Sequence, residues 1–216
     1  MTAPEVELRR TWRRLAGSGH DHRLEQLVAL HRDPTRHYHG TTHVMWVLRH
    51  VDDLLRARAG QDEVDDRIDA DAVRLAALFH DIVYDATRSD NEARSADLAV
   101  QVATELGWPT ERCDTVHRLV MATAGHSPTH DDEAVLVDAD LAILGSSPAE
   151  YAAYVHGVRH EYAHVDDDSW RTGRAAVLRR FLDTPHLFAT PHMGEQREAR
   201  ARANLTAELS ELTRGQ

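Results

Sequence analysis

Four ionisable side chains stand in stretches of sequence that are otherwise apolar: His43, His80, Asp81 and Asp140. A buried carboxylate that stays charged is costly unless it is paired or binds a metal. Two imidazoles and two carboxylates form a ligand set that suits Mn²⁺, Fe, Co²⁺, Ni²⁺ or Zn²⁺, and suits Mg²⁺ less well because of its imidazoles. We therefore expect these four residues to hold one or two divalent transition-metal ions.

The His80–Asp81 pair lies in the middle of a segment that is apolar nearly all round, and this pattern predicts a buried helix over 70–84. An adjacent imidazole and carboxylate can offer a nitrogen and an oxygen to one cation beside the helix. A salt-bridged pair that only stabilises the core explains this segment equally well. His43 shares a helical face with Val47, near the start of a core-facing stripe. Taken alone, His43 is better explained as a partly buried histidine bonded to a backbone carbonyl.

Two aspartates compete for the last ligand position, and their helical neighbours differ. Asp140 has large apolar residues three and four positions away on both sides, whereas the neighbours of Asp138 at the same offsets are smaller. We expect Asp140 to be the ligand and Asp138 to support the ligands from behind. The reverse assignment stays open, and so does a role for either aspartate as a helix cap.

The elements that must position these residues are all helices, because apolar residues recur at spacings of three and four and short Gly, Ser and Pro breaks separate the segments. The sequence predicts an all-α, single-domain bundle of about ten helices over residues 1–216. The predicted helices span about 5–16, 20–32, 41–59, 70–84, 90–106, 110–124, 134–144, 148–164, 169–183 and 194–213. Ser147 with Glu150 and Ser89 with Glu92 have the spacing of a capping box. The acidic stretch Gln61–Asp71 is expected to be a solvated loop.

Composition excludes several classes of function. All 25 basic residues are arginine, which removes a P-loop lysine, a Schiff-base lysine and a Ser-Lys dyad. The net charge of −11 argues against general nucleic-acid binding. The single cysteine, Cys113, excludes a disulfide framework within the chain and any multi-cysteine metal site. Since no apolar run approaches the ~20 residues of a spanning helix, we expect a soluble cytoplasmic protein without a membrane partner. The sequence does not indicate an oligomeric state.

The ordered set of motifs resembles the HD-domain superfamily of metal-dependent phosphohydrolases, and in particular its predicted bacterial phosphohydrolases, over roughly residues 30–210. The motifs are Tyr38-His39 with His43, His80-Asp81-Ile82-Val83-Tyr84, Asp90-Asn91-Glu92 with Ser95, Asp138 to Gly145, Val158 to Tyr162, and Gly173-Arg174. The resemblance implies an all-α domain with the metal on His43, His80, Asp81 and Asp140. It also implies hydrolysis of a phosphate ester, often of a nucleotide. Gly40 departs from the asparagine that is frequent in the subgroup.

Catalytic roles are expected for Asp81, Glu92 and His126. A metal-activated water would attack the phosphorus atom, and Asp81 would both bind the metal and orient the water. Glu92 either orients the water or a ligand, or only closes its capping box. His126, with His130, either completes a second metal site, donates a proton to the leaving group, or is an ordinary loop histidine.

Substrate-binding roles are expected for Arg159, Arg174, Tyr162 and His39. Without lysine, the charge of a phosphate must be met by arginine, histidine or metal. Arg159 and Arg174 each follow an apolar stripe residue by four positions, so they are predicted to point inward, where a guanidinium suits phosphate. An internal salt bridge to a carboxylate such as Glu92 or Glu161 is an equal alternative. Arg36 is a weaker candidate.

Two other functions stay open beside phosphate-ester hydrolysis. The first is a nucleotide-binding sensor without turnover, against which the complete ligand set argues. The second is a diiron oxygenase, which requires further histidine ligands such as His126 and His130.

Overall fold

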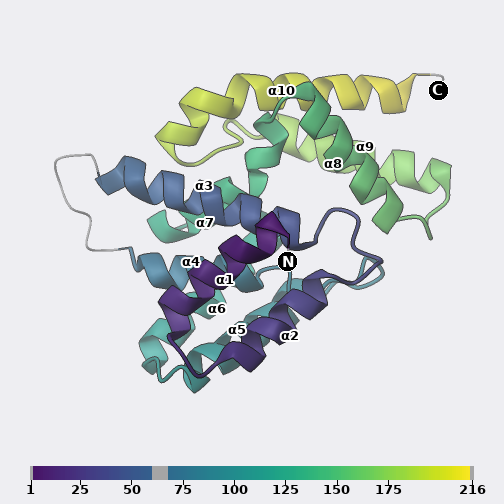
Figure 1. Ribbon diagram of the computed structural model, residues 1–216. Helices are drawn as coiled ribbons and strands as arrows, with labels where there is room; N and C mark the ends of the chain where they lie inside the picture. Colours follow the sequence, from purple (N-terminus) through teal and green to yellow (C-terminus); the bar gives the residue numbers. More distant parts are fainter. Residues whose placement is uncertain (1, 60–67, 215–216) are drawn as a thin grey trace. The chain divides into compact units, whose positions relative to one another are not determined.

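The computed structural model describes residues 2–59 and 68–214, and in these ranges it contains ten α-helices, one 3₁₀ helix and no strand (Figure 1). The predicted all-α class is therefore confirmed. The first seven helices are α1 (Ala3–Ala16), α2 (Asp21–His31), α3 (Thr41–Ala59), α4 (Ala70–Phe79), α5 (Asn91–Glu105), α6 (Thr110–Gly125) and α7 (Asp131–Leu141). They are followed by η1 (Ala142–Gly145), α8 (Pro148–Glu161), α9 (Asp167–Asp183) and α10 (Pro191–Thr213).

The chain divides into two compact units, Met1–Asp140 and Leu141–Gln216, with the division at the end of α7. The single domain expected from the length of the chain stays a prediction. The expected loop at Gln61–Asp71 falls largely on residues 60–67, which lie outside the described residues. Its last residues begin α4, because the Asp69 carboxylate accepts hydrogen bonds from the amides of Asp71 and Ala72 at 3.1 and 3.0 Å.

Helix α4 is the central helix of the first unit. All of its residues from Ala72 to Phe79 are buried, and it packs against α1, α3, α5 and α6. Trp12 of α1 is completely buried, and its ring lies 6.4 Å from the ring of Phe79. A helix that is apolar all round needs such cover on every side, as the sequence predicted.

The structure corrects the end of this helix. Helix α4 stops at Phe79, so His80 and Asp81 lie just beyond its C-terminus and not in the middle of a helix over 70–84. The physical reason is directional, because adjacent residues on a helix do not face each other. Once the backbone leaves the helix in a turn, both side chains can point to the same place.

The second unit packs α10 along η1 and α9, with α8 also against η1. The predicted capping box of α8 is present, with Ser147 and Glu150 bonded reciprocally. Helix α10 begins three residues before the expected 194, because Thr190 caps it and Pro191 fits its first turn. Gly145 is required where η1 meets α10, since a Cβ there would lie 2.6 Å from the Cβ of Arg197.

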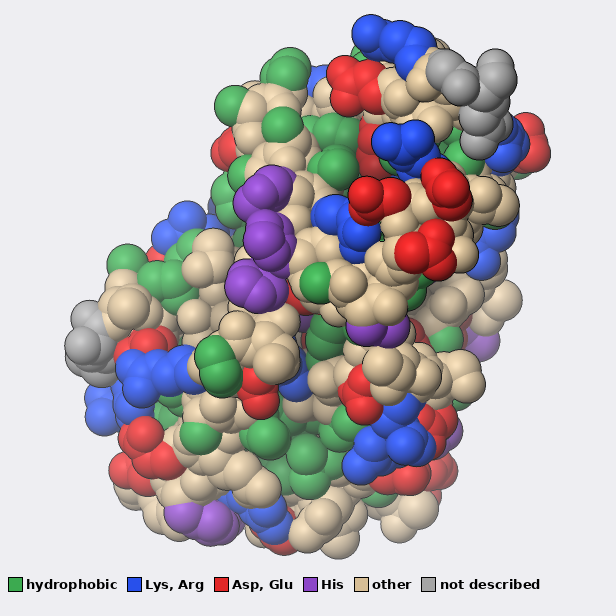
Figure 2. Space-filling model, turned by 90° about the vertical axis from the view of Figure 1, so that its right-hand side faces the viewer, with side chains coloured by type: hydrophobic (Ala, Val, Ile, Leu, Met, Phe, Trp, Pro, Cys, Tyr) green, Lys and Arg blue, Asp and Glu red, His purple; other side chains and the backbone are tan. Residues whose placement is uncertain are grey.

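No helix in the described ranges is long and apolar enough to cross a bilayer. On the face drawn in Figure 2, arginine side chains lie among acidic ones, and no broad continuous basic patch is visible there. Arginine and acidic side chains also pair directly, as Arg9 does with Glu25 and Arg112 does with Asp69.

Candidate metal centre

Three of the predicted ligands meet inside the first unit, each carried by the end of a different helix. His43 lies in the first turn of α3, His80 directly follows α4, and Asp140 lies in the last turn of α7. The two Nε2 atoms are 3.1 Å apart. Asp140 Oδ1 lies 3.3 Å from His43 Nε2 and 3.6 Å from His80 Nε2. One atom of each side chain therefore faces the same point.

These distances match the spacing of ligands around a metal ion. With metal–ligand bonds of about 2.1 Å, neighbouring ligand atoms are about 3.0 Å apart in an octahedron and about 3.4 Å apart in a tetrahedron. The donor set of two imidazoles and a carboxylate is one that transition metals prefer. The residues present therefore fit a divalent transition metal.

Asp81 adds a fourth donor beside this triad. Its Oδ2 atom lies 3.1 Å from His80 Nε2 and 3.3 Å from His43 Nε2. The side chains of Asp81 and Asp140 are 17% and 15% exposed, whereas the two histidines are almost completely buried. The carboxylates are thus the partly exposed members of this group, and the imidazoles are its buried members.

The ring of His80 is oriented by its own helix. Its Nδ1 atom lies 3.0 Å from the carbonyl oxygen of Ala77, and because a carbonyl only accepts, Nδ1 carries the proton. In the neutral ring Nε2 then presents its lone pair to the centre. A backbone carbonyl behind the ring is a usual partner of metal-binding histidines.

The electrostatics keep both carboxylates charged. Burial alone would raise the pKa of each aspartate, but the charges of His80 and His39 hold the pKa of Asp81 well below its usual range. The contacts with His126, His43 and His80 do the same for the pKa of Asp140. Burial would lower the pKa of His43 and His80, yet their contacts with these two aspartates raise it.

His126 approaches the centre from the opposite side of Asp140. Its Nε2 atom lies 3.3 Å from Asp140 Oδ2, the oxygen that does not face the pair of imidazoles. His126 follows α6 in the left-handed region, with φ of 51° and ψ of 37°. That conformation is uncommon for a residue other than glycine and frequent at functional sites. His130 lies elsewhere, exposed and bonded to Thr129 and Glu133.

Aromatic rings cover the first ligand. The rings of His39 and Tyr84 stack at 4.2 Å between centroids, and His39 meets the ring of His43 edge-on at 5.5 Å. Tyr38 lies 4.8 Å from the rings of both His39 and His43. The predicted substrate residue His39 is therefore next to the candidate ligands.

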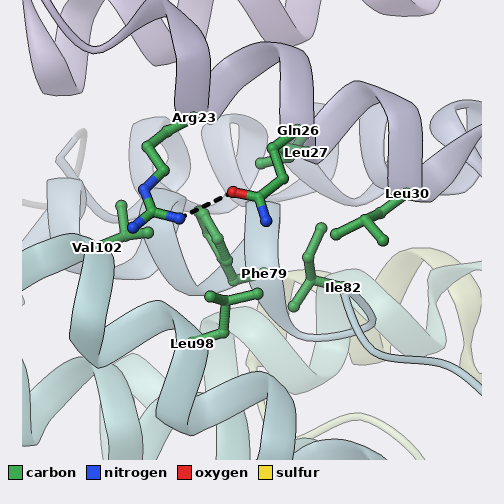
Figure 3. A pocket seen from close by; sticks show the side chains of 8 residues that line it. All are labelled: Arg23, Gln26, Leu27, Leu30, Phe79, Ile82, Leu98 and Val102. Atoms are coloured by element: carbon green, nitrogen blue, oxygen red, sulfur yellow. Dashed lines mark hydrogen bonds between the residues drawn. The ribbon is translucent and has the colours of Figure 1, made fainter.

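The apolar neighbours of the His80–Asp81 pair anchor it in the core. Phe79 and Ile82 point into a small pocket between α2 and α5 (Figure 3). Its polar lining consists of Arg23 and Gln26, which are bonded to each other at 2.8 Å. None of the predicted site residues lines this pocket, so it anchors the turn and offers no donor to a metal.

The motif after this turn fastens its backbone. The side-chain amide of Asn91 accepts from the amide of Asp85 at 3.1 Å and donates to its carbonyl at 2.9 Å. Ser95 Oγ accepts from the amide of Val83 at 3.1 Å. Glu92 is half-buried in the first turn of α5, and in the described ranges no hydrogen bond or ion pair joins it to the centre. Its expected catalytic role stays a prediction.

The structure distinguishes the two aspartates of α7 and shows how α5 begins. Asp140, and not Asp138, supplies the carboxylate of the triad, while Asp138 is completely buried on the same helix. The capping box expected for Ser89 with Glu92 is absent, since Asp90 is the N-cap of α5 and makes no side-chain cap bond.

The predicted arginines lie in the second unit and bind protein groups there. Arg174 forms two bonds with the Glu208 carboxylate, at 2.8 and 3.0 Å. Arg159 donates to the carbonyls of Tyr162 and Val165 and pairs with Asp167, which fastens the end of α8. Arg174 therefore forms the internal ion pair that the sequence left open, but its partner is Glu208 and not Glu92 or Glu161. The sequence did not indicate Glu208, because only two of its four neighbours at offsets of three and four, Leu205 and Leu212, are apolar.

The geometry therefore offers a buried centre with two imidazoles, two carboxylates and a nearby histidine. Such an arrangement can hold a divalent metal and place a proton-carrying side chain beside it. Comparison with known proteins found no match to a family model, to a curated protein or to a solved structure.

Proposed function

We propose that the protein is a metal-dependent hydrolase of phosphate esters, with a small nucleotide as the favoured class of substrate. The observation that carries this proposal is the convergence of His43 Nε2, His80 Nε2 and Asp140 Oδ1, within 3.1 to 3.6 Å of one another. The motif resemblance to HD-domain phosphohydrolases supports phosphate-ester hydrolysis among the reactions that such a centre allows. Asp81 is the fourth ligand in this proposal.

A divalent metal bound by these residues would lower the pKa of water and polarise a phosphoryl oxygen. Asp81 accepts a hydrogen bond from the attacking water and directs it towards the phosphorus atom. Asp140 holds His126 through its outer oxygen, at 3.3 Å. In this proposal the His126 ring carries a proton on each nitrogen: Asp140 holds the Nε2 proton, and the Nδ1 proton passes to the leaving oxygen.

The charge of the phosphate is assigned to groups of the first unit. Arg159 and Arg174 already bind a carboxylate or backbone carbonyls, so their guanidinium groups are engaged. Apart from the ligands His43 and His80, His126 contacts Asp140, and the charge of His39 acts on Asp81. We therefore propose that the phosphoryl oxygens contact the metal, His39 and His126. The expected substrate contact of Tyr162, in the second unit, stays a prediction.

The test joins metal analysis with a screen for phosphate release. The full chain is assayed with nucleoside mono-, di- and triphosphates and sugar phosphates in the presence of Mn²⁺, Co²⁺ or Zn²⁺. We expect at least one to be hydrolysed, with His80→Ala and Asp81→Ala inactive and the exposed control Asp97→Asn fully active. Nucleotide binding without product over hours would replace hydrolysis by a sensor role. Two bound irons with oxygen-dependent turnover would replace it by an oxygenase.

A further inference from the structure

We propose that Arg36 is a positioning residue for the metal centre: it fixes the turn that carries His80 and Asp81, and His31 holds Arg36 in place. This inference rests on the metal site of the proposed function. It assigns Arg36 a role inside the protein in place of the weak phosphate-binding role that the sequence suggested.

The guanidinium of Arg36 reaches the backbone on both sides of the centre. Nη1 donates to the carbonyl of Asp81 at 2.7 Å, and Nη2 donates to the carbonyl of Ile82 at 2.8 Å. Nη1 also donates to the carbonyl of His39 at 3.1 Å. One side chain thus ties the ligand turn after α4 to the loop that leads into α3 and His43.

The turn needs such donors because helix α4 ends there. The last carbonyls of a helix have no partner within it. Here those of Ala76, Ala77 and Phe79 are bonded by the amide of His80, by His80 Nδ1 and by the amide of Ile82. Further along, the carbonyls of Asp81 and Ile82 have Arg36 as their donor. Without the guanidinium, the carbonyls of half-buried Asp81 and buried Ile82 would lose these donors.

His31 completes the arrangement from α2. Its ring is 2% exposed and lies between a hydrogen-bond acceptor and a hydrogen-bond donor. Nε2 faces the carbonyl of Leu78 at 3.4 Å, and Nδ1 faces Arg36 Nη1 at 3.1 Å. Because a carbonyl only accepts and a guanidinium only donates, Nε2 carries the proton and Nδ1 accepts. Burial and the charge of Arg36 lower the pKa of His31 to about 3, so the ring stays neutral as this arrangement requires.

The backbone near His31 is packed too closely to shift freely. A Cβ at Gly40 would lie 3.1 Å from the carbonyl oxygen of His31. The end of α2 and the loop before α3 are therefore in direct contact, three residues ahead of His43. This close approach brings Gly40 against the end of α2, next to the residues that hold the turn.

The test measures metal affinity with Co²⁺ alone, by titration calorimetry and by the visible absorption of the cobalt-loaded full chain. Arg36→Gln is expected to weaken Co²⁺ binding about 10- to 100-fold and to alter the cobalt spectrum, as the loss of a supporting group behind metal ligands does. Arg36→Lys, which keeps the charge, should recover part of the affinity. Arg118→Gln is the matched control, because Arg118 is likewise an arginine of the same unit held by several bonds, three of them to Asp132 and Glu133.

The control separates positioning from stability. Arg118→Gln is expected to lower the melting temperature and leave Co²⁺ affinity and spectrum unchanged. If Arg36→Gln does not fold, His31→Leu decides, since leucine offers no acceptor for Arg36; we expect it to weaken Co²⁺ binding about tenfold. Affinity within twofold of the unmodified chain in the folded variant overturns the positioning role while the metal site stands. No Co²⁺ binding by the unmodified chain overturns the metal site itself.

Discussion

Two groups of buried charged side chains differ in how their donors and acceptors meet. In the second unit, Arg174 is 8% and Glu208 is 7% exposed, and two hydrogen bonds join the guanidinium to the carboxylate. Tyr151 donates to the same carboxylate at 2.5 Å, and Arg174 Nη1 donates to Tyr154 at 3.1 Å. Each donor points at an acceptor, so the group satisfies itself.

In the candidate metal centre, four atoms that metals use as ligands point at one another. His43 Nε2 and His80 Nε2 are 3.1 Å apart, and both face the oxygens of Asp81 and Asp140. Burial of charge is common to both groups and therefore does not identify a metal site. The distinguishing feature is the direction of the atoms, because complementary pairs stabilise the protein by themselves whereas converging ligand atoms favour a cation.

Removal of a converging ligand should have the largest effect. His80→Ala is expected to abolish stoichiometric metal binding and phosphate release, because it removes the imidazole that contacts His43 and both aspartates. Metal content by mass spectrometry and the release assay check this on protein whose circular dichroism is unchanged. A folded variant that keeps one tightly bound metal would show that the centre lies elsewhere.

Breaking the complementary pair should cost stability and leave metal binding unchanged. Arg174→Met is expected to lower the free energy of unfolding by about 3–5 kcal/mol, because Glu208 stays buried without its cation. The double variant Arg174→Met with Glu208→Leu should recover much of that loss. Urea denaturation gives the free energies, and Co²⁺ titration gives the affinity. A folded single variant with strongly weakened Co²⁺ binding would argue against the distinction.

The two aspartates of α7 should separate by their effect on metal affinity. Asp140→Asn is expected to weaken Co²⁺ binding more than about 100-fold, whereas Asp138→Asn weakens it about tenfold or less. The reason is that Asp140 faces both imidazoles and Asp138 is not part of the triad. Calorimetry of both variants side by side decides, and the opposite order would make Asp138 the ligand.

We expect the smallest effect on stability at the other end of α7. There the carboxylate of Glu133 accepts hydrogen bonds from Arg118 and Thr129. Burial would raise its pKa, but bonds from Thr129 and Arg118 lower it from 4.5 to about 2. A carboxyl group with a lowered pKa stabilises the fold above pH 4.5, and this contribution disappears as the pH falls towards 2. Glu133→Gln should therefore be less stable than the unmodified chain near neutral pH, with the gap closing in acid. Thermal unfolding across pH measures it, and a gap independent of pH would contradict it.

The helices and the triad could be predicted from the sequence because both depend on local pattern. Apolar spacing gave α3 its exact bounds, 41–59, and Ser147 with Glu150 marked the start of α8. His80 and Asp140 stood out because each interrupts an apolar stripe, whereas His43 was assigned only in combination with them. Buried polar residues in such stripes are expensive, so their positions carry information.

What the sequence could not supply depends on contacts across the chain. The apolar run that continues past Phe79 gives no sign that α4 ends there. Ile82 is buried because α2 and α5 cover it, and not because it belongs to α4. The left-handed backbone of His126 has no signal in residue type, because glycine is its usual marker. The bonds from Arg36 to Asp81 and Ile82 join residues 45 and 46 positions apart, beyond any helical periodicity.

The most direct test of the metal centre is a crystal structure of the full chain grown with Mn²⁺ or Zn²⁺ and measured at the absorption edge of the metal. We predict an anomalous peak about 2.1 Å from His43 Nε2, His80 Nε2 and an oxygen of Asp140, with Asp81 within reach of the same ion. A well-ordered centre without a peak at saturating metal, or a peak bound by other residues alone, would contradict the account.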